Sequence, residues 1–139
     1  MHPGGRLGKQ LAPVSALMHG GEAVPRVRLE TPMREVIYEM SRKGLGMTVV
    51  EEPDGRLAGM LSDGDLRRLL ERKGAEALGL TAGEAMHRGA RTVGPEELAV
   101  RALATMEEHK ITSLLVVEPG TARVVGVVHL HDLWRTELV

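Results

Sequence analysis

In the stretch Gly59-Met60-Leu61-Ser62-Asp63-Gly64-Asp65-Leu66-Arg67-Arg68, an apolar strand end runs into a polar turn and then into a helix. Ser62 and Asp63 are both residue types that cap helix N-termini, so backbone N–H groups should gather at this corner. A helix start of this kind attracts anions such as phosphate. The corner also offers a hydroxyl, the carboxylate of Asp65 and two guanidinium groups, which suit phosphate, ribose and an anionic sugar.

The corner occurs twice in the chain. Gly126-Val127-Val128-His129-Leu130-His131-Asp132-Leu133 has the same spacing from Gly to Asp, and an offset of about 67 residues marks an internal repeat. One unit of this size covers its own apolar sheet face poorly. We therefore expect an α+β fold in which two β-α-β-β-α repeats are related by a pseudo-twofold axis, pack sheet to sheet and form two related clefts.

Apolar periodicity, turn residues and helix caps predict the elements of each copy. In the first copy they predict an extended piece at 24–29, a helix from Thr31-Pro32 to Gly44, strands at 47–50 and 57–61, and a helix at 63–73. In the second copy they predict a strand at 91–93, a helix from Pro95, strands at 111–117 and 124–128, and a helix at 132–138. Thr81 and Glu84 have capping-box spacing, and Met86-His87 after them echoes Met18-His19.

Composition excludes several classes of protein. A net charge of -1 over 139 residues argues against binding nucleic acid or a membrane surface through bulk charge. With no Phe and only Tyr38 and Trp134, bases have almost no aromatic platform to stack on. The absence of Cys rules out disulfides and thiolate metal sites and fits a reducing compartment. The sequence shows no signal peptide and no apolar run near the roughly 18 residues of a membrane span, so we expect a cytoplasmic protein.

The two copies resemble a tandem pair of CBS repeats, also called a Bateman module. Each copy ends in the Gly-x-x-(Ser/Thr)-x-x-Asp motif of that family. The first copy matches it with Gly59, Ser62 and Asp65, whereas the second keeps Gly126 and Asp132 but has His129 in place of Ser or Thr. The resemblance implies a leading segment at 1–13, one CBS repeat at 14–74 and another at 80–136.

Four segments sharpen the resemblance: His2-Pro3-Gly4-Gly5-Arg6-Leu7-Gly8-Lys9, Leu45-Gly46-Met47-Thr48-Val49-Val50, the corner at 62–68 and His129-Leu130-His131-Asp132-Leu133. Together they are similar to the C-terminal part of bacterial arabinose-5-phosphate isomerases. There, an N-terminal sugar-isomerase (SIS) domain converts ribulose 5-phosphate to arabinose 5-phosphate for Kdo synthesis. The resemblance implies that 1–13 is a remnant of this domain, with His2 from its active site, and that this chain alone is no enzyme. The implied partners are the SIS domain of the full-length parent and further copies in a homodimer or higher homo-oligomer.

The resemblance also implies a bound nucleotide or sugar nucleotide, with no required cofactor. In CBS modules the motif Asp holds ribose hydroxyls, the Ser or Thr faces phosphate, and middle-strand backbone meets the base. The pathway favours CMP-Kdo as a feedback signal, while an AMP- or ATP-type ligand and a purely structural, oligomerising module remain alternatives. The candidate ligand-binding residues are Gly46, Met47, Thr48, Ser62, Asp63, Asp65, Arg67, Arg68, Thr112, Ser113, Leu114, His129, His131 and Asp132.

Each candidate also has a simpler interpretation. Ser62 and Asp65 could serve only as helix caps, and the two arginines could form a solvated helix face. His129 and His131 bracket one residue and would point the same way on a strand end. They could contact an anion, complete a structural turn, or bind a metal with a third histidine from His19, His87 or His109. No nucleophile, base and acid stand in catalytic order, so we expect no catalytic residues. No third ligand lies close to His129 and His131 in sequence, so we expect no metal site.

Overall fold

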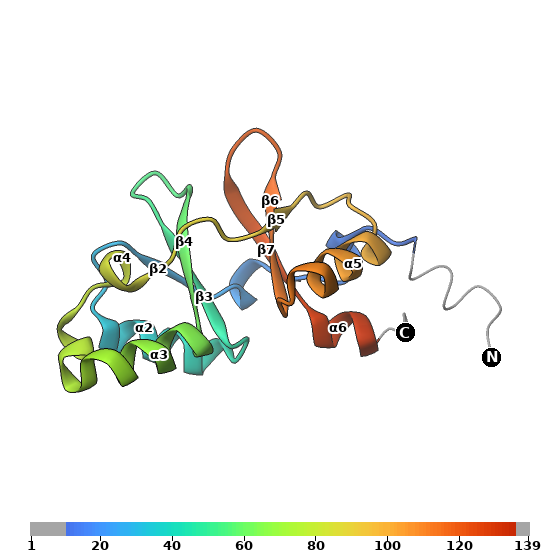
Figure 1. Ribbon diagram of the computed structural model, residues 1–139. Coiled ribbons are helices and arrows are strands. Elements are labelled where there is room, and N and C mark those ends of the chain that lie inside the picture. Colours follow the sequence, from blue (N-terminus) through green and yellow to red (C-terminus); the bar gives the residue numbers. More distant parts are fainter. Residues whose placement is uncertain (1–10, 136–139) are drawn as a thin grey trace. The chain divides into compact units, whose positions relative to one another are not determined.

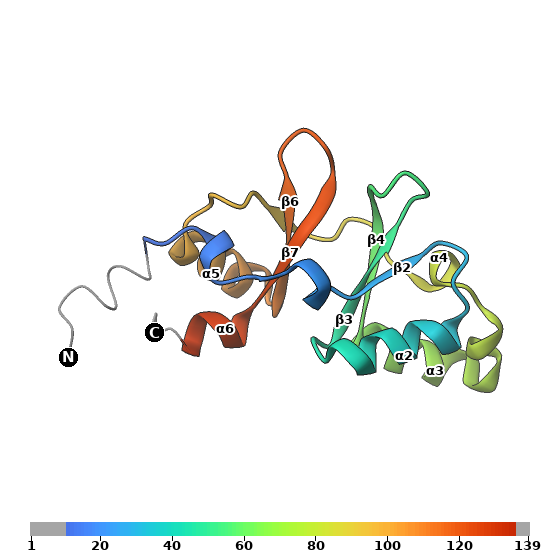
Figure 2. The same ribbon diagram turned by 180° about the vertical axis from the view of Figure 1, so that it is seen from behind.

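The computed structural model describes residues 11–135, which form two compact units of mixed helix and sheet (Figures 1 and 2). One unit is Glu22–Ala90, and the other joins the chain up to Gly21 with the chain from Arg91. The α+β class is confirmed, while the sheet-to-sheet packing of the repeats stays a prediction. Within the described part of the chain, no helix has the length and apolar character that crossing a bilayer requires.

The unit at Glu22–Ala90 holds the first copy of the repeat. Its elements are β2 (Arg26–Arg28), α2 (Met33–Lys43), β3 (Met47–Glu51), β4 (Leu57–Ser62) and α3 (Asp63–Lys73), followed by the 3-10 helix η3 (Gly74–Gly79) and by α4 (Ala82–Ala85). A further 3-10 turn, η2 (Gly21–Ala23), leads into β2. The sheet has the order β2-β3-β4, with β2 parallel and β4 antiparallel to β3. The predicted order of strand, helix, strand, strand, helix is confirmed.

The other unit holds the second copy, together with the start of the described chain. Its elements are the 3-10 turn η1 (Val14–Ala16), β1 (His19–Gly20), β5 (Thr92–Val93), α5 (Ala99–His109), β6 (Ser113–Glu118), β7 (Arg123–His129) and α6 (Leu130–Arg135). The sheet order is β1-β7-β6-β5, with β5 parallel to β6 and the other neighbours antiparallel. The same five-element order therefore recurs, with β1 added at the edge beside β7.

An apolar stripe on the first helix of each copy builds the core. Met33, Val36 and Met40 lie on one face of α2 and are buried with residues of β3, β4 and α3. In the second copy Ala99, Ala102, Leu103 and Met106 of α5 repeat this spacing and are buried with Leu114, Val116, Val128 and Leu133. Burial of one stripe fixes each of these helices against its sheet. The second helix of each copy, α3 or α6, begins directly after the last strand, β4 or β7.

Three local predictions differ from the structure, and in each case a hydrogen bond outside the predicted helix is involved. The hydroxyl of Thr31 accepts from the backbone N–H of Arg28 at 2.9 Å, so Pro32 and not Thr31 is the N-cap of α2. The helix expected from Pro95 begins at Ala99, since the backbone N–H groups of Val14 and Ser15 bond to the carbonyls of Glu97 and Pro95. The helix expected from 132 begins at Leu130, which donates to Thr112 O at 2.7 Å.

Short segments outside the two five-element repeats pack beside the last strand of each unit. Residues 19–20 pair with β7, and His87 pairs with Met60 of β4. Each Met-His pair is thereby brought to the end of a strand that leads into a motif helix. The repeat boundaries 1–13, 14–74 and 80–136 stay predictions. Residues 1–10 and 136–139, with the predicted ends at 136 and 138, lie outside the described residues.

Candidate functional site

The first corner joins β4 to α3 through a reciprocal pair of hydrogen bonds. Ser62 is the N-cap: its hydroxyl accepts from Asp65 N at 3.1 Å, and its own N–H donates to Asp65 Oδ2 at 2.9 Å. This is the capping box that the Ser62 and Asp65 spacing favours. It holds the carboxylate of Asp65 at the corner, where 22% of the side chain is exposed.

Two further side chains reach the Asp65 carboxylate. Arg68 Nη2 donates to Oδ1 at 2.8 Å, and His87 Nε2 lies 3.2 Å from Oδ2. Burial raises the pKa of Asp65, but the hydrogen bonds from Ser62 and Arg68 and the nearby His87 outweigh it, so the pKa lies below its ordinary value of 3.8. Asp65 is therefore a charged acceptor at neutral pH.

The second corner joins β7 to α6 and repeats this arrangement. The backbone N–H of His129 donates to Asp132 Oδ2 at 3.2 Å. His19 Nε2 lies 2.8 Å from the same oxygen, and only 13% of the Asp132 side chain is exposed. Because a carboxylate only accepts, the hydrogen of this bond must sit on Nε2 of His19. Both motif carboxylates are thus held on Oδ2 by a backbone N–H and faced there by a histidine from another segment.

The motif glycines make room for the segments that carry these histidines. A Cβ atom on Gly59 would lie 2.6 Å from both His87 O and Met86 Sδ. A Cβ on Gly126 would lie 2.3 Å from Met18 Sδ and 3.1 Å from the carbonyl oxygen of His19. Real Cβ atoms do not approach other atoms at 2.3 to 2.6 Å. The glycine that begins each motif therefore leaves room for a Met-His pair, and the aspartate that ends the motif faces the imidazole of that pair.

The middle-strand candidates lie next to the corners through the backbone. Asp63 N donates to Gly46 O at 2.9 Å, as Leu130 N does to Thr112 O. Met47 is opposite Ser62 in the sheet, and Ser113 is opposite His129. The side chains of Met47, Thr48 and Leu114 are buried in their own units. The structure thus brings Gly46 and Met47 to the first corner, and Thr112 and Ser113 to the second.

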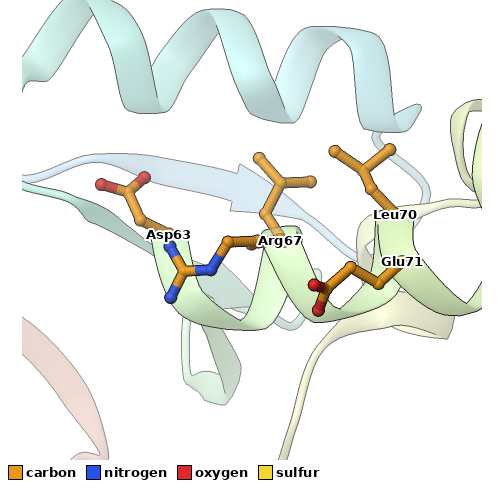
Figure 3. A pocket seen from close by; sticks show the side chains of 5 residues that line it. Asp63, Arg67, Leu70 and Glu71 are labelled. Atoms are coloured by element: carbon orange, nitrogen blue, oxygen red, sulfur yellow. The ribbon is translucent and has the colours of Figure 1, made fainter.

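The two arginines of α3 have different neighbours. Arg68 turns back to Asp65, whereas Arg67 lines an open hollow on α3 together with Asp63, Leu66, Leu70 and Glu71 (Figure 3). Figure 3 shows the Arg67 guanidinium extended along the helix toward Asp63. Leu70, an apolar residue of α3, is 39% exposed beside this hollow. The role of the two arginines in ligand binding stays a prediction.

The expectation that His129 and His131 point the same way is wrong. His129 is the last residue of β7, but His131 lies in α6, so the strand alternation ends between them. His129 is half-buried and His131 is exposed. Among residues 11–135, no three His, Asp or Glu side chains gather closely enough to hold a metal ion. His19 and His87, which the sequence offered only as possible third metal ligands, face carboxylates instead.

Comparison with known proteins accounts for the duplication. The family profile described as "CBS domain" matches residues 14–72 and again 82–133. The chain belongs to the CBS-domain family. This CBS chain is 47% identical over 135 residues to the arabinose 5-phosphate isomerase KdsD of Pseudomonas aeruginosa. The match covers 96% of the chain but only 41% of the relative, so it concerns the CBS part of that enzyme.

Two solved structures share the fold of this CBS chain. CBSX2, crystallised in complex with AMP, superimposes with a TM-score of 0.78 at 21% identity and covers 91% of this chain and 96% of its own. The CBS domain pair of protein MJ0100, in complex with 5-methylthioadenosine and S-adenosyl-L-methionine, has a TM-score of 0.79 at 19% identity. That match covers 90% of this chain and 94% of the pair. At this identity the likeness is one of fold.

Proposed function

We propose that this CBS chain is the regulatory region of an arabinose-5-phosphate isomerase and that it binds a nucleotide or sugar nucleotide. The observation that carries the proposal is the duplicated corner, which places one partly buried carboxylate, Asp65 or Asp132, at the end of the last strand in each unit. The 47% identity to the isomerase of Pseudomonas aeruginosa supports the parent enzyme. In that parent, a cytoplasmic homo-oligomer, the SIS domain performs the aldose–ketose isomerisation.

The chemistry of each corner suits a nucleotide. A charged carboxylate accepts hydrogen bonds from the two ribose hydroxyls. AMP, 5-methylthioadenosine and S-adenosylmethionine, the ligands of the two neighbours, all contain ribose. Phosphate and other anionic groups would meet Ser62 and Arg68 at the first corner, and His129 and His131 at the second. The backbone of 46–48 and 112–114 would face the base.

Within this class we favour CMP-Kdo, the activated end product of the isomerase pathway. Cytidine would supply the ribose, while the phosphate and the Kdo carboxylate would use the basic side chains around the corners. Binding would regulate the attached SIS domain if the ligand has unequal affinity for two states of the enzyme. The ligand would then report the supply of activated Kdo to the first step of its synthesis.

Titration calorimetry of this chain with CMP-Kdo, CMP, AMP and ATP tests the proposal. Heat from CMP-Kdo, with much weaker heat from CMP and none from the adenine nucleotides, supports feedback sensing by the end product. Heat from AMP or ATP alone keeps nucleotide binding but replaces CMP-Kdo with an adenine nucleotide as the signal. If none of the four ligands gives binding heat, the proposal is contradicted and an oligomerising module is the better account.

A further inference from the structure

Each motif carboxylate meets a histidine that lies outside the motif. His87 approaches Asp65 from the segment after α4, and His19 approaches Asp132 from β1, 113 residues away in sequence. In both units the contact is made by Nε2 and falls on Oδ2. Two independent segments thus place the same ring atom beside the same carboxylate oxygen. In each unit the methionine before that histidine packs against the motif glycine.

The oxygen that the histidine occupies already has another donor. Oδ2 of Asp65 accepts from Ser62 N at 2.9 Å, and Oδ2 of Asp132 accepts from His129 N at 3.2 Å. A carboxylate oxygen has two lone pairs. The backbone N–H uses one of them, and the imidazole, hydrogen-bonded at Asp132 and in ion-pair contact at Asp65, occupies the remaining side of Oδ2. The other oxygen, Oδ1, is then the one that a ligand hydroxyl can use. The imidazole also limits rotation of the carboxyl group, which the backbone bond alone would allow.

At the first corner Oδ1 of Asp65 has a partner of its own. Arg68 Nη2 donates to it at 2.8 Å, and 58% of the Arg68 side chain is exposed. Exposed ion pairs between neighbouring turns of one helix are weak and screened by salt. Arg68 can therefore turn from Asp65 toward an anionic group of a ligand, leaving Oδ1 to a hydroxyl, while His87 stays on Oδ2.

We propose that His19 and His87 are positioning residues of the two ligand sites, where each imidazole holds Oδ2 of its carboxylate so that Oδ1 faces a ligand hydroxyl. The inference rests on the proposed nucleotide-binding function and adds two residues that the motif does not contain. The His19 contact is shorter than that of His87, at 2.8 against 3.2 Å, and Asp132 is the less exposed carboxylate. His19 therefore contributes more to its site than His87 does.

The test compares alanine and glutamine at both positions, with CMP-Kdo as the probe, or AMP if that is what the wild-type chain binds. His19→Ala removes a hydrogen-bond donor and His87→Ala removes an ion-pair contact. His19→Ala should weaken binding at its own site by about tenfold, the usual effect of losing one hydrogen bond to a charged group, and His87→Ala should weaken binding at its site by a smaller factor. His19→Gln and His87→Gln should restore most of the affinity, because the amide N–H₂ of glutamine can donate to Oδ2. His109→Ala, at an exposed histidine in the last turn of α5, is the matched control and should bind like wild type.

The outcomes separate positioning from a merely structural role. If the alanine variants lose thermal stability but bind as tightly as wild type, the histidines only fasten the Met-His segments, and the inference is wrong while the proposed function stands. If glutamine fails to restore affinity in chains that melt like wild type, donation to Oδ2 is not the cause, and the inference is also overturned. If the wild-type chain binds no nucleotide at all, the proposed function fails and this inference fails with it.

Discussion

Gly59 lies directly beneath the backbone carbonyl of His87: a Cβ atom on Gly59 would come within 2.6 Å of that oxygen. Met60, the next residue, exchanges two backbone hydrogen bonds of 3.0 Å with His87, so the carbonyl cannot move away without losing them. Gly59 is not among the residues with positive φ. The motif glycine is therefore required by the closeness of a second backbone and not by its own conformation.

The first prediction concerns this crossing. Gly59→Ala should lower the free energy of unfolding by about 1–3 kcal/mol, because overpacking forces the backbone to shift. Gly126→Ala should cost less, since the atom nearest to its Cβ is Sδ of the flexible Met18 side chain and the His19 carbonyl is 3.1 Å away. Urea unfolding followed by circular dichroism measures all three chains.

Gly94→Ala supplies the matched control for this comparison. No atom lies within 4 Å of a Cβ built there, and its φ is not positive. Its stability should equal or slightly exceed that of wild type, because alanine restricts the unfolded chain. A Gly59→Ala chain as stable as the Gly94→Ala chain would show that the crossing is looser than the distances indicate.

The second prediction uses the two equivalent helix ends. Helix α2 ends at Gly44 with φ of 71°, but α5 ends at Lys110 with φ of 55°, which a residue with a side chain adopts at a cost. Lys110→Gly should therefore stabilise the protein by about 1 kcal/mol. Glu107→Gly, inside the same helix, should destabilise it by about the same amount. Thermal unfolding measures both variants. If both glycine substitutions raise the melting temperature, or both lower it, this account is contradicted.

The third prediction is a loss of stability in acid. The pKa of Asp65 and that of Glu39 both lie below their ordinary values, 3.8 and 4.5, because hydrogen bonds and neighbouring cations outweigh the effect of burial. A carboxylate with a lowered pKa stabilises the folded state above its unfolded pKa, and this contribution is lost as the pH falls through the folded value. The urea concentration at the unfolding midpoint should therefore decrease as the pH is lowered below about 4.

Substitution assigns part of this acid response to Asp65. Asp65→Asn should lower the midpoint at pH 7, and its difference from wild type should shrink as the pH falls, because the wild-type carboxylate is then protonated. Glu71→Gln, at an exposed position on the same helix, should shift the curve uniformly and only slightly. A constant difference between Asp65→Asn and wild type at every pH would refute the role of charge.

The elements fixed by short-range chemistry could be predicted from the sequence. The stripe on α2, the capping boxes at Ser62 and Thr81 and the left-handed Gly44 depend on residues within one or two turns. The α+β class and the duplication also followed, since both copies carry the same pattern of strands and helices. The start of α5 did not follow, because the hydrogen bonds that delay it come from Val14 and Ser15, far away in the chain.

The histidines of the site could not be derived from sequence for the same reason. His19 and Asp132 are joined only by the pairing of β1 with β7, and no local pattern fixes that pairing. The signal was the repeated Met-His pair, which marked the duplication but gave no indication of a carboxylate. Spacing also misled at His129 and His131, because strand alternation does not continue across the start of a helix.

The fourth prediction tests the two carboxylates as hydroxyl acceptors. Asp65→Asn and Asp132→Asn keep the side-chain volume but remove the charge, so each should weaken CMP-Kdo or AMP binding at its own corner by about tenfold. Thr105→Ala, at a half-buried position on α5 whose hydroxyl donates to Arg101 O, should leave the affinity unchanged. Because the corners belong to different units, the variant that loses affinity identifies the occupied corner. If both corners are occupied, each variant should lose one of the two binding events seen with wild type. If both aspartate variants fold like wild type and bind as tightly, ribose is not held by these carboxylates, and the ligand must use the backbone and the basic side chains alone.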